Sequence, residues 1–141
     1  RAQRLQQAVL DARPDWVLLA GWLALFPIPP QLAGHVLNIH PALLPEHGGA
    51  GRYGHHVHEA VARAHSRWSG CTVHFADAVY DRGPILLQTA VNLPSGADPE
   101  LIAARVFAAE MEAYPEALSH LLAGRARWDQ GTVRWTLAPA P

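Results

Sequence analysis

The sequence predicts an α/β fold in which a mostly parallel, open sheet is flanked by helices, within a single domain over residues 1–141. The continuous apolar run 16–20 is typical of a buried strand of a parallel sheet, and residues 35–39 have the pattern of a second short buried strand. Segments with the helical spacing of apolar residues alternate with these strand-like runs. Half of the residues are hydrophobic, which is enough to build one core.

The first third of the chain begins with a helix. Residues 1–12 have the amphipathic pattern of a short helix, and Pro14 marks its end because a proline disfavours helical geometry in the residue before it. The strand 16–20 follows at once. Residues 27–34 form a proline-rich connection with at most one helical turn, and this connection leads into the strand 35–39.

The middle of the chain contains a loop, a helix and two strands. Residues 40–54 are rich in glycine and proline and predict a long loop, a length that is usually functional. Apolar residues fall on one face of a helix over 55–65. The segments 70–76 and 85–93 have the pattern of strands, and residues 77–84 form the turn between them.

A long helix is predicted over residues 98–122. Asp98 is a good N-cap, and Gly124 ends the helix. Pro115 should kink or divide it, because proline lacks the backbone N–H that an interior position donates. Two short alternating segments follow and predict a hairpin; they span residues 125–128 and 132–137.

Composition excludes several classes of function. Eleven Lys plus Arg against twelve Asp plus Glu give a formal charge of −1, which argues against nucleic-acid binding and against a polybasic membrane patch. The apolar run 16–26 is too short to span a bilayer. Cys71 is the single cysteine and cannot form an internal disulfide, so we expect a reduced, cytoplasmic protein.

Asn38 and His40 end the second predicted strand, where ligands bind in α/β sheets. They are two residues apart and can therefore point to the same side. An Asn amide can donate to an oxyanion, and a histidine can exchange a proton near neutral pH. From the spacing alone, two polar residues that merely end a strand are the favoured interpretation, because a motif this short is weak.

Asp81 lies in the turn Tyr-Asp-Arg-Gly-Pro at 80–84. An ordinary turn aspartate is a common use of this residue. The functional alternative is a carboxylate that pairs with His40, raises the pKa of that histidine and orients its ring.

Three further patterns have both functional and structural interpretations. His55, His56 and His58 could form part of a metal site, but no Cys or Glu accompanies them at ligand spacing, so we expect none. The glycine-rich segment 48–54 could approach an anion or be a mobile loop. The five tryptophans, Trp22 among them, could line a pocket for a flat ring or belong to the core.

Together, four strings resemble the formyltransferases that use 10-formyltetrahydrofolate, which have a Rossmann-like fold. They are Leu-Ala-Gly-Trp at 19–22, Asn-Ile-His-Pro-Ala-Leu-Leu-Pro at 38–45, Thr-Val-His-Phe at 72–75 and Tyr-Asp-Arg-Gly-Pro-Ile-Leu-Leu-Gln at 80–88. The second string is very specific to that superfamily. The loop at 48–61 is similar to that of one branch of phosphoribosylglycinamide formyltransferases.

The resemblance implies a role for each matching residue. His40 would be the general acid, Asn38 the oxyanion donor, and Asp81 would tune His40 and organise a proton-shuttling water. The other implied residues contact the two substrates. Those for the folate are Trp22, Leu23, Ala24, Leu25, Phe26, Asn38 and Asp77; those for the nucleotide are Pro41 and Glu110, the latter at the ribose.

The implied reaction transfers a formyl group from the co-substrate 10-formyltetrahydrofolate to the amine of glycinamide ribonucleotide, in purine biosynthesis, without a metal, by a monomer or homodimer. The first strand, the Gly-Ser-rich phosphate loop and the next strand and helix of the family have no counterpart here. We therefore expect an N-terminally truncated chain that holds folate but holds the ribonucleotide poorly. The alternatives are a formyltetrahydrofolate hydrolase and a non-catalytic folate-binding fragment.

Overall fold

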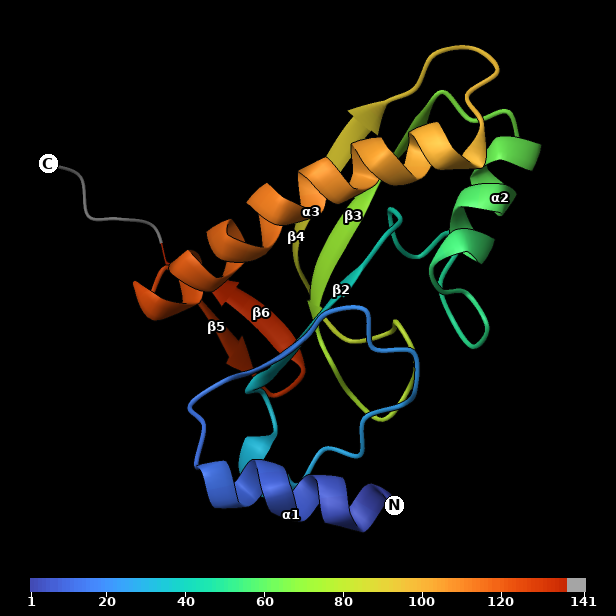
Figure 1. The fold of residues 1–141 in the computed structure, drawn as a ribbon. Coiled ribbons are helices and arrows are strands. Elements are labelled where there is room, and N and C mark those ends of the chain that lie inside the picture. Colours follow the sequence, from blue (N-terminus) through green and yellow to red (C-terminus); the bar gives the residue numbers. More distant parts are fainter. Residues whose placement is uncertain (137–141) are drawn as a thin grey trace, which may run out of the picture.

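A four-stranded mixed sheet forms the centre of the computed structural model, which describes residues 1–136 (Figure 1). The strands are β1 (Val17–Leu19), β2 (Val36–His40), β3 (Trp68–Phe75) and β4 (Ile85–Asn92), in the spatial order β1-β2-β3-β4. Only β1 and β2 are parallel, whereas β2–β3 and β3–β4 are antiparallel. The α/β class is confirmed, but the expectation of a mostly parallel sheet is wrong for the described strands.

The short connection between β3 and β4 explains why these two strands are antiparallel. Residues 76–84 return the chain directly into the neighbouring strand, and such a short connection can join only antiparallel strands. The connection from β1 to β2 contains the single 3₁₀ turn η1 (Pro30–Leu32), as predicted. β1 lies at the edge of the described sheet, so Leu18 is 43% exposed although the sequence predicted a buried strand.

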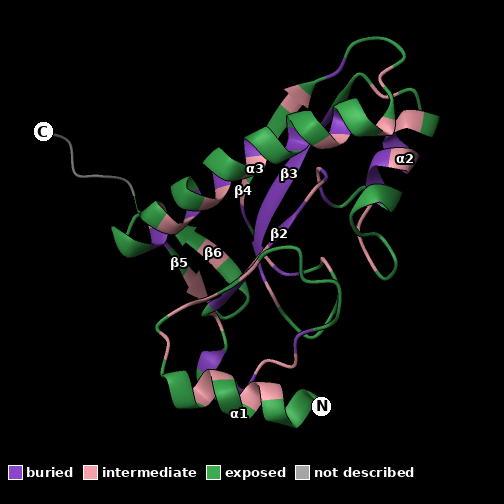
Figure 2. Cartoon of the chain, viewed as in Figure 1, coloured by how far each residue is buried: buried purple, intermediate pink, exposed green. Residues whose placement is uncertain are grey.

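The helix α3 (Pro99–Leu122) covers β3 and β4 and closes the main core. Its inner face buries Ile102, Val106, Ala109, Ala113, Ala117 and Leu121, while its outer face is exposed (Figure 2). Asp98 caps the helix as predicted, with its carboxylate accepting a hydrogen bond from Leu101 N at 2.8 Å. The helix continues through Pro115, so the proline does not divide it.

Two smaller helices lie at either end of the sheet (Figure 1). α1 (Ala2–Ala12) packs Leu5, Val9 and Leu10 against a second cluster around Phe26, Leu32 and Val36. α2 (His55–Arg63) packs against α3 and buries Val57, His58, Ala60 and Val61. Both helices match their predicted positions to within two residues, because the apolar spacing marks the face that each one buries.

The described chain ends in a separate two-stranded hairpin of β5 (Ala126–Asp129) and β6 (Thr132–Trp135). This element was predicted, although Leu137 of the second predicted segment lies outside the described residues. Among residues 1–136, no helix is long and apolar enough to cross a membrane.

Candidate active site

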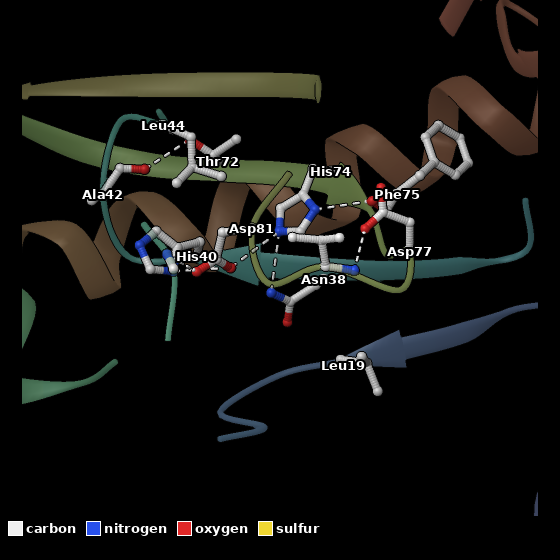
Figure 3. Close-up of polar contacts among 12 residues, drawn as sticks. Leu19, Asn38, His40, Ala42, Leu44, Thr72, His74, Phe75, Asp77 and Asp81 are labelled. Carbon is white, nitrogen blue, oxygen red and sulfur yellow. Dashed lines mark hydrogen bonds and ion pairs between the residues drawn. The ribbon is translucent and has the colours of Figure 1, made fainter. Parts of the chain in front are cut away.

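The polar centre of the molecule lies where β2 and β3 run side by side (Figure 3). Asn38 and His74 are directly paired across the two antiparallel strands, and His40 is paired with Thr72. Directly opposed residues project to the same face of a sheet, so the Asn38 and His74 side chains meet. Their Nδ2 and Nε2 atoms are 3.2 Å apart.

Asp81 reaches this pair of strands from the turn that follows β3. Its Oδ1 lies 3.5 Å from His40 Nδ1 and 3.6 Å from His74 Nε2, so one carboxylate faces both imidazoles. All three side chains are nearly buried, with at most 9% exposed. The structure thus brings together the three residues that the sequence singled out and adds His74 to them (Figure 3).

His74 orients the Asn38 amide. The carbonyl oxygen of Phe75 can only accept, so His74 Nδ1, 3.0 Å away, donates to it and carries a proton. An amide nitrogen can only donate, so Nε2 is the acceptor for one Asn38 amide hydrogen. The second hydrogen of that amide stays available for a group in the cavity.

The loop after His40 closes over this histidine. His40 Nε2 donates to the carbonyl oxygen of His47 at 2.8 Å, and the Gly49 N–H donates to Asp81 Oδ2 at 2.9 Å. A β-carbon at Gly48 would press against the Leu44 and Asp81 side chains, so a larger residue there would force these neighbours to shift.

Thr72 anchors the start of the same loop from β3. Its hydroxyl donates to Ala42 O at 2.7 Å and accepts from Leu44 N and Gln88 Nε2, each at 3.0 Å. These hydrogen bonds fix the segment that follows His40 and Pro41. The position of the His40 side chain therefore depends on the buried hydroxyl of Thr72, which lies on the strand that leads into the turn of Asp81.

Burial and the neighbouring charges shift the pKa values in this centre. Burial is the largest influence on His40 and lowers its pKa; Asp81 and the His47 carbonyl oppose this without reversing it. The predicted raising effect of Asp81 is thus present but outweighed. Burial alone would raise the pKa of Asp81, but the contact with His74, the charge of His40 and the Gly49 N–H together lower it. Asp81 is therefore ionised beside a histidine that is readily neutral.

A cavity of about 910 Å³ opens over this centre. It is large enough for a drug-sized ligand or more. Every residue predicted to contact a substrate lines it: Trp22, Leu23, Ala24, Leu25, Phe26, Asn38, His40, Pro41, Asp77, Asp81 and Glu110. Trp22 is 42% exposed, so the pocket interpretation of this tryptophan describes its place better than the core interpretation.

One end of the cavity is apolar and lies between the segment after β1 and the turn 76–84. The two walls are joined by a hydrogen bond of 2.7 Å from Leu25 N to the Tyr80 hydroxyl. Exposed Leu23, Leu25 and Val79 surround this end. Flat apolar walls with few polar groups suit an aromatic ring system.

The other end of the cavity is bounded by α2 and α3. Glu110 lies here with a half-buried carboxyl whose pKa is raised by burial. Tyr114, on the next turn of α3, donates to Leu19 O at 2.9 Å and ties the helix to the end of β1. Among residues 1–136, no group of three metal-binding side chains comes together, and the histidines of α2 do not converge on one point.

Residues 1–118 match the sequence pattern of the formyl transferase family. The chain belongs to the formyl transferase family. It is 44% identical over 121 residues to the chloroplastic phosphoribosylglycinamide formyltransferase of Arabidopsis thaliana. Its structure is similar to a glycinamide ribonucleotide transformylase of Symbiobacterium toebii, with a TM-score of 0.83 and 33% identity. A formyltetrahydrofolate deformylase of Pseudomonas syringae shares the fold, with a TM-score of 0.80 at 23% identity.

The match extends over most of this formyl transferase chain but only part of each relative. The alignment with the Arabidopsis protein covers 84% of this chain and 41% of that protein. The alignment with the Symbiobacterium structure covers 96% of this chain and 63% of that chain, and the deformylase alignment covers 96% and 44%. The chain therefore spans about two fifths of the length of the Arabidopsis relative.

His74 is the central residue that the sequence analysis did not assign. It is 2% exposed and touches both Asn38 and Asp81. The signal was present in the string Thr-Val-His-Phe, where a histidine stands among apolar strand residues. Its importance depends on the pairing of β2 with β3, which no local pattern reveals.

Proposed function

We propose that this chain carries the catalytic centre for transfer of a formyl group from 10-formyltetrahydrofolate to the amine of glycinamide ribonucleotide. The observation that carries the proposal is the group of Asn38, His40 and Asp81 at the floor of a largely apolar cavity, in a chain of the formyl transferase family. The names of the Arabidopsis and Symbiobacterium relatives support the choice of nucleotide.

The bond changes assign a task to each polar group. The substrate amine attacks the formyl carbon, a new C–N bond forms, and the carbonyl electron pair moves to oxygen. Asn38 Nδ2 and His40 Nε2 are the donors available to that oxyanion once His40 leaves the His47 carbonyl. When the intermediate collapses, the bond from the formyl carbon to the folate nitrogen breaks.

Proton transfer completes the reaction. The attacking nitrogen loses one proton and the folate nitrogen gains one, so the overall exchange consumes no proton. Asp81 is the ionised acceptor closest to His40, and the pair can pass a proton between them. The lowered pKa of His40 favours a neutral ring that donates from Nε2 and receives charge only as the reaction proceeds.

The two ends of the cavity divide the substrates between them. The apolar end around Leu23, Leu25 and Tyr80 would hold the pterin ring, and the end that carries Glu110 would hold the ribonucleotide. The formyl carbon and the amine then meet over Asn38 and His40. The cytoplasmic location, the monomeric or homodimeric state and the single-domain organisation stay predictions.

The test is formyl transfer from a 10-formyltetrahydrofolate analogue to glycinamide ribonucleotide, followed by absorbance. We expect transfer by the wild type and a loss of about 100- to 10,000-fold in kcat for His40→Ala. His56→Ala, an exposed histidine outside the cavity lining, is the matched control and should keep wild-type kcat. Equal activity of His40→Ala and wild type refutes the proposal. Formate release without ribonucleotide indicates hydrolysis, and folate binding without either product indicates a non-catalytic fragment.

A further inference from the structure

His58 is the part of the His-His-Val-His segment that the proposed reaction leaves unexplained. It is 7% exposed, whereas His55 and His56 on the same helix are exposed. His55 lies one turn before it and pairs with Glu59 at 3.3 Å, a surface contact. His58 instead belongs to the face of α2 that is buried towards α3 and the cavity.

The Nδ1 atom of His58 is buried and has no hydrogen-bond partner among the described residues. Buried polar atoms in folded proteins nearly always have a partner, since an unpaired one loses the hydrogen bonds that it would make to water. A histidine that served only to pack would be satisfied by a neighbouring carbonyl or hydroxyl. The unpaired atom therefore indicates that something else completes this position.

The surroundings of His58 show where such a partner would come from. His58 lines the same cavity as Asn38, His40 and Glu110, at the end bounded by α2 and α3. Burial lowers the pKa of His58 first, and the charges of His55 and His40 lower it further. The ring is therefore neutral near neutral pH, with one donor and one acceptor nitrogen.

We propose that His58 is a positioning residue that forms a hydrogen bond with a hydroxyl or amide group of glycinamide ribonucleotide at the α2–α3 end of the cavity. The proposal rests on the proposed function, since it concerns the same nucleotide. Glu110 offers only acceptors in its ionised form, whereas the neutral imidazole offers one donor and one acceptor. The two side chains together can recognise neighbouring polar groups on one sugar or on its amide arm.

This role predicts a specific kinetic signature. A hydrogen bond that is present in both the bound state and the transition state lowers KM without changing kcat. Replacing His58 by leucine removes the bond and also removes the unpaired buried nitrogen, so the fold should not weaken. Asparagine places an amide near the position of Nδ1 and should restore much of the binding.

The experiment compares wild type, His58→Leu, His58→Asn and the matched control His56→Leu on the same helix. KM and kcat are measured with glycinamide ribonucleotide, the Kd of a reduced folate is measured by calorimetry, and Tm is measured for each variant. We expect His58→Leu to raise KM about three- to tenfold, the worth of one hydrogen bond. We expect kcat within about twofold of wild type, with folate Kd and Tm unchanged or Tm raised. His58→Asn should recover at least half of the lost affinity, and His56→Leu should match wild type.

Three outcomes overturn the assignment. An unchanged KM in His58→Leu shows that the residue does not contact the nucleotide. If only kcat falls in His58→Leu, the residue acts through His40. If both Tm and folate affinity fall in that variant, its role is purely structural. These results leave the proposed function standing if the wild type transfers formyl groups. Absence of transfer by the wild type would instead refute both.

Discussion

Replacing Asp81 by asparagine tests the electrostatic centre of the site. The substitution keeps the shape and removes the charge that faces His40 Nδ1 at 3.5 Å and His74 Nε2 at 3.6 Å. Asp81 has a left-handed backbone with φ of 54°, which asparagine also tolerates, so no new strain arises. The effect should therefore come from the lost charge.

The magnitude follows from the distance and the burial. A nearby carboxylate stabilises the charged form of an imidazole and so raises its pKa. Asp81 raises the pKa of His40 against the larger effect of burial, so its removal should lower the pKa of His40 further. The reaction also loses its proton acceptor, and we expect kcat to fall by about 100-fold or more.

The assay is kcat for formyl transfer between about pH 5.5 and 9, together with an NMR titration of the His40 ring. Asp129→Asn, in the exposed hairpin where Asp129 pairs with Arg134, is a control for the loss of one carboxylate. If the pKa of His40 stays unchanged in Asp81→Asn, or if the variant keeps more than a tenth of kcat, the assigned role of Asp81 is wrong.

The same variant also predicts a pH dependence of stability. The pKa of Asp81 is lowered in the folded state, so its contribution to folding is present above the ordinary value of 3.8. That contribution is lost as the pH falls through the folded pKa. The difference in unfolding free energy between wild type and Asp81→Asn should be constant near neutral pH and vanish in acid.

Two further variants test the surroundings of the centre. Glu110→Gln should raise KM for the ribonucleotide and raise Tm at neutral pH. Burial raises the pKa of Glu110, so the stability that this residue contributes is present below the ordinary value of 4.5 and is lost as the pH rises through its folded pKa. Equal Tm values for wild type and Glu110→Gln at pH 7 would contradict this. Thr72→Val keeps the shape but leaves Leu44 N and Ala42 O without their partner and removes one of the two hydrogen bonds of Gln88 Nε2. It should lower the unfolding free energy by about 1–3 kcal/mol in urea titrations and lower kcat, whereas wild-type values for both would show that Thr72 does not support the loop.

Local patterns predicted most elements of the fold because each depends on a few neighbouring residues. The N-cap at Asp98 and the apolar face of α3 follow from positions within one helix. Local hydrophobicity also predicted β1 and β2 as buried strands of a parallel sheet, and their parallel pairing was confirmed. The antiparallel pairing of β2 with β3 was missed, since an apolar strand does not reveal the direction of its neighbour.

The candidate site divides in the same way. Asn38 and His40 could be selected because they end one strand two residues apart, and this spacing alone directs them to one side. Asp81 could be proposed only as one of two interpretations, because a turn aspartate has the same local sequence whether or not it meets a histidine 41 residues earlier. His74 and His58 were not assigned, since their partners lie on other elements.

By itself, the sequence determined the fold class, the positions of the helices and strands, and the residues that could carry acid–base chemistry. The tertiary structure alone decided that one carboxylate faces two imidazoles, that the loop closes on His40 through His47, and that burial outweighs Asp81 in setting the pKa of His40. The physical reason is range: propensity and periodicity act between neighbours in the chain, whereas pKa shifts and hydrogen bonds depend on what the folded chain brings within a few ångströms.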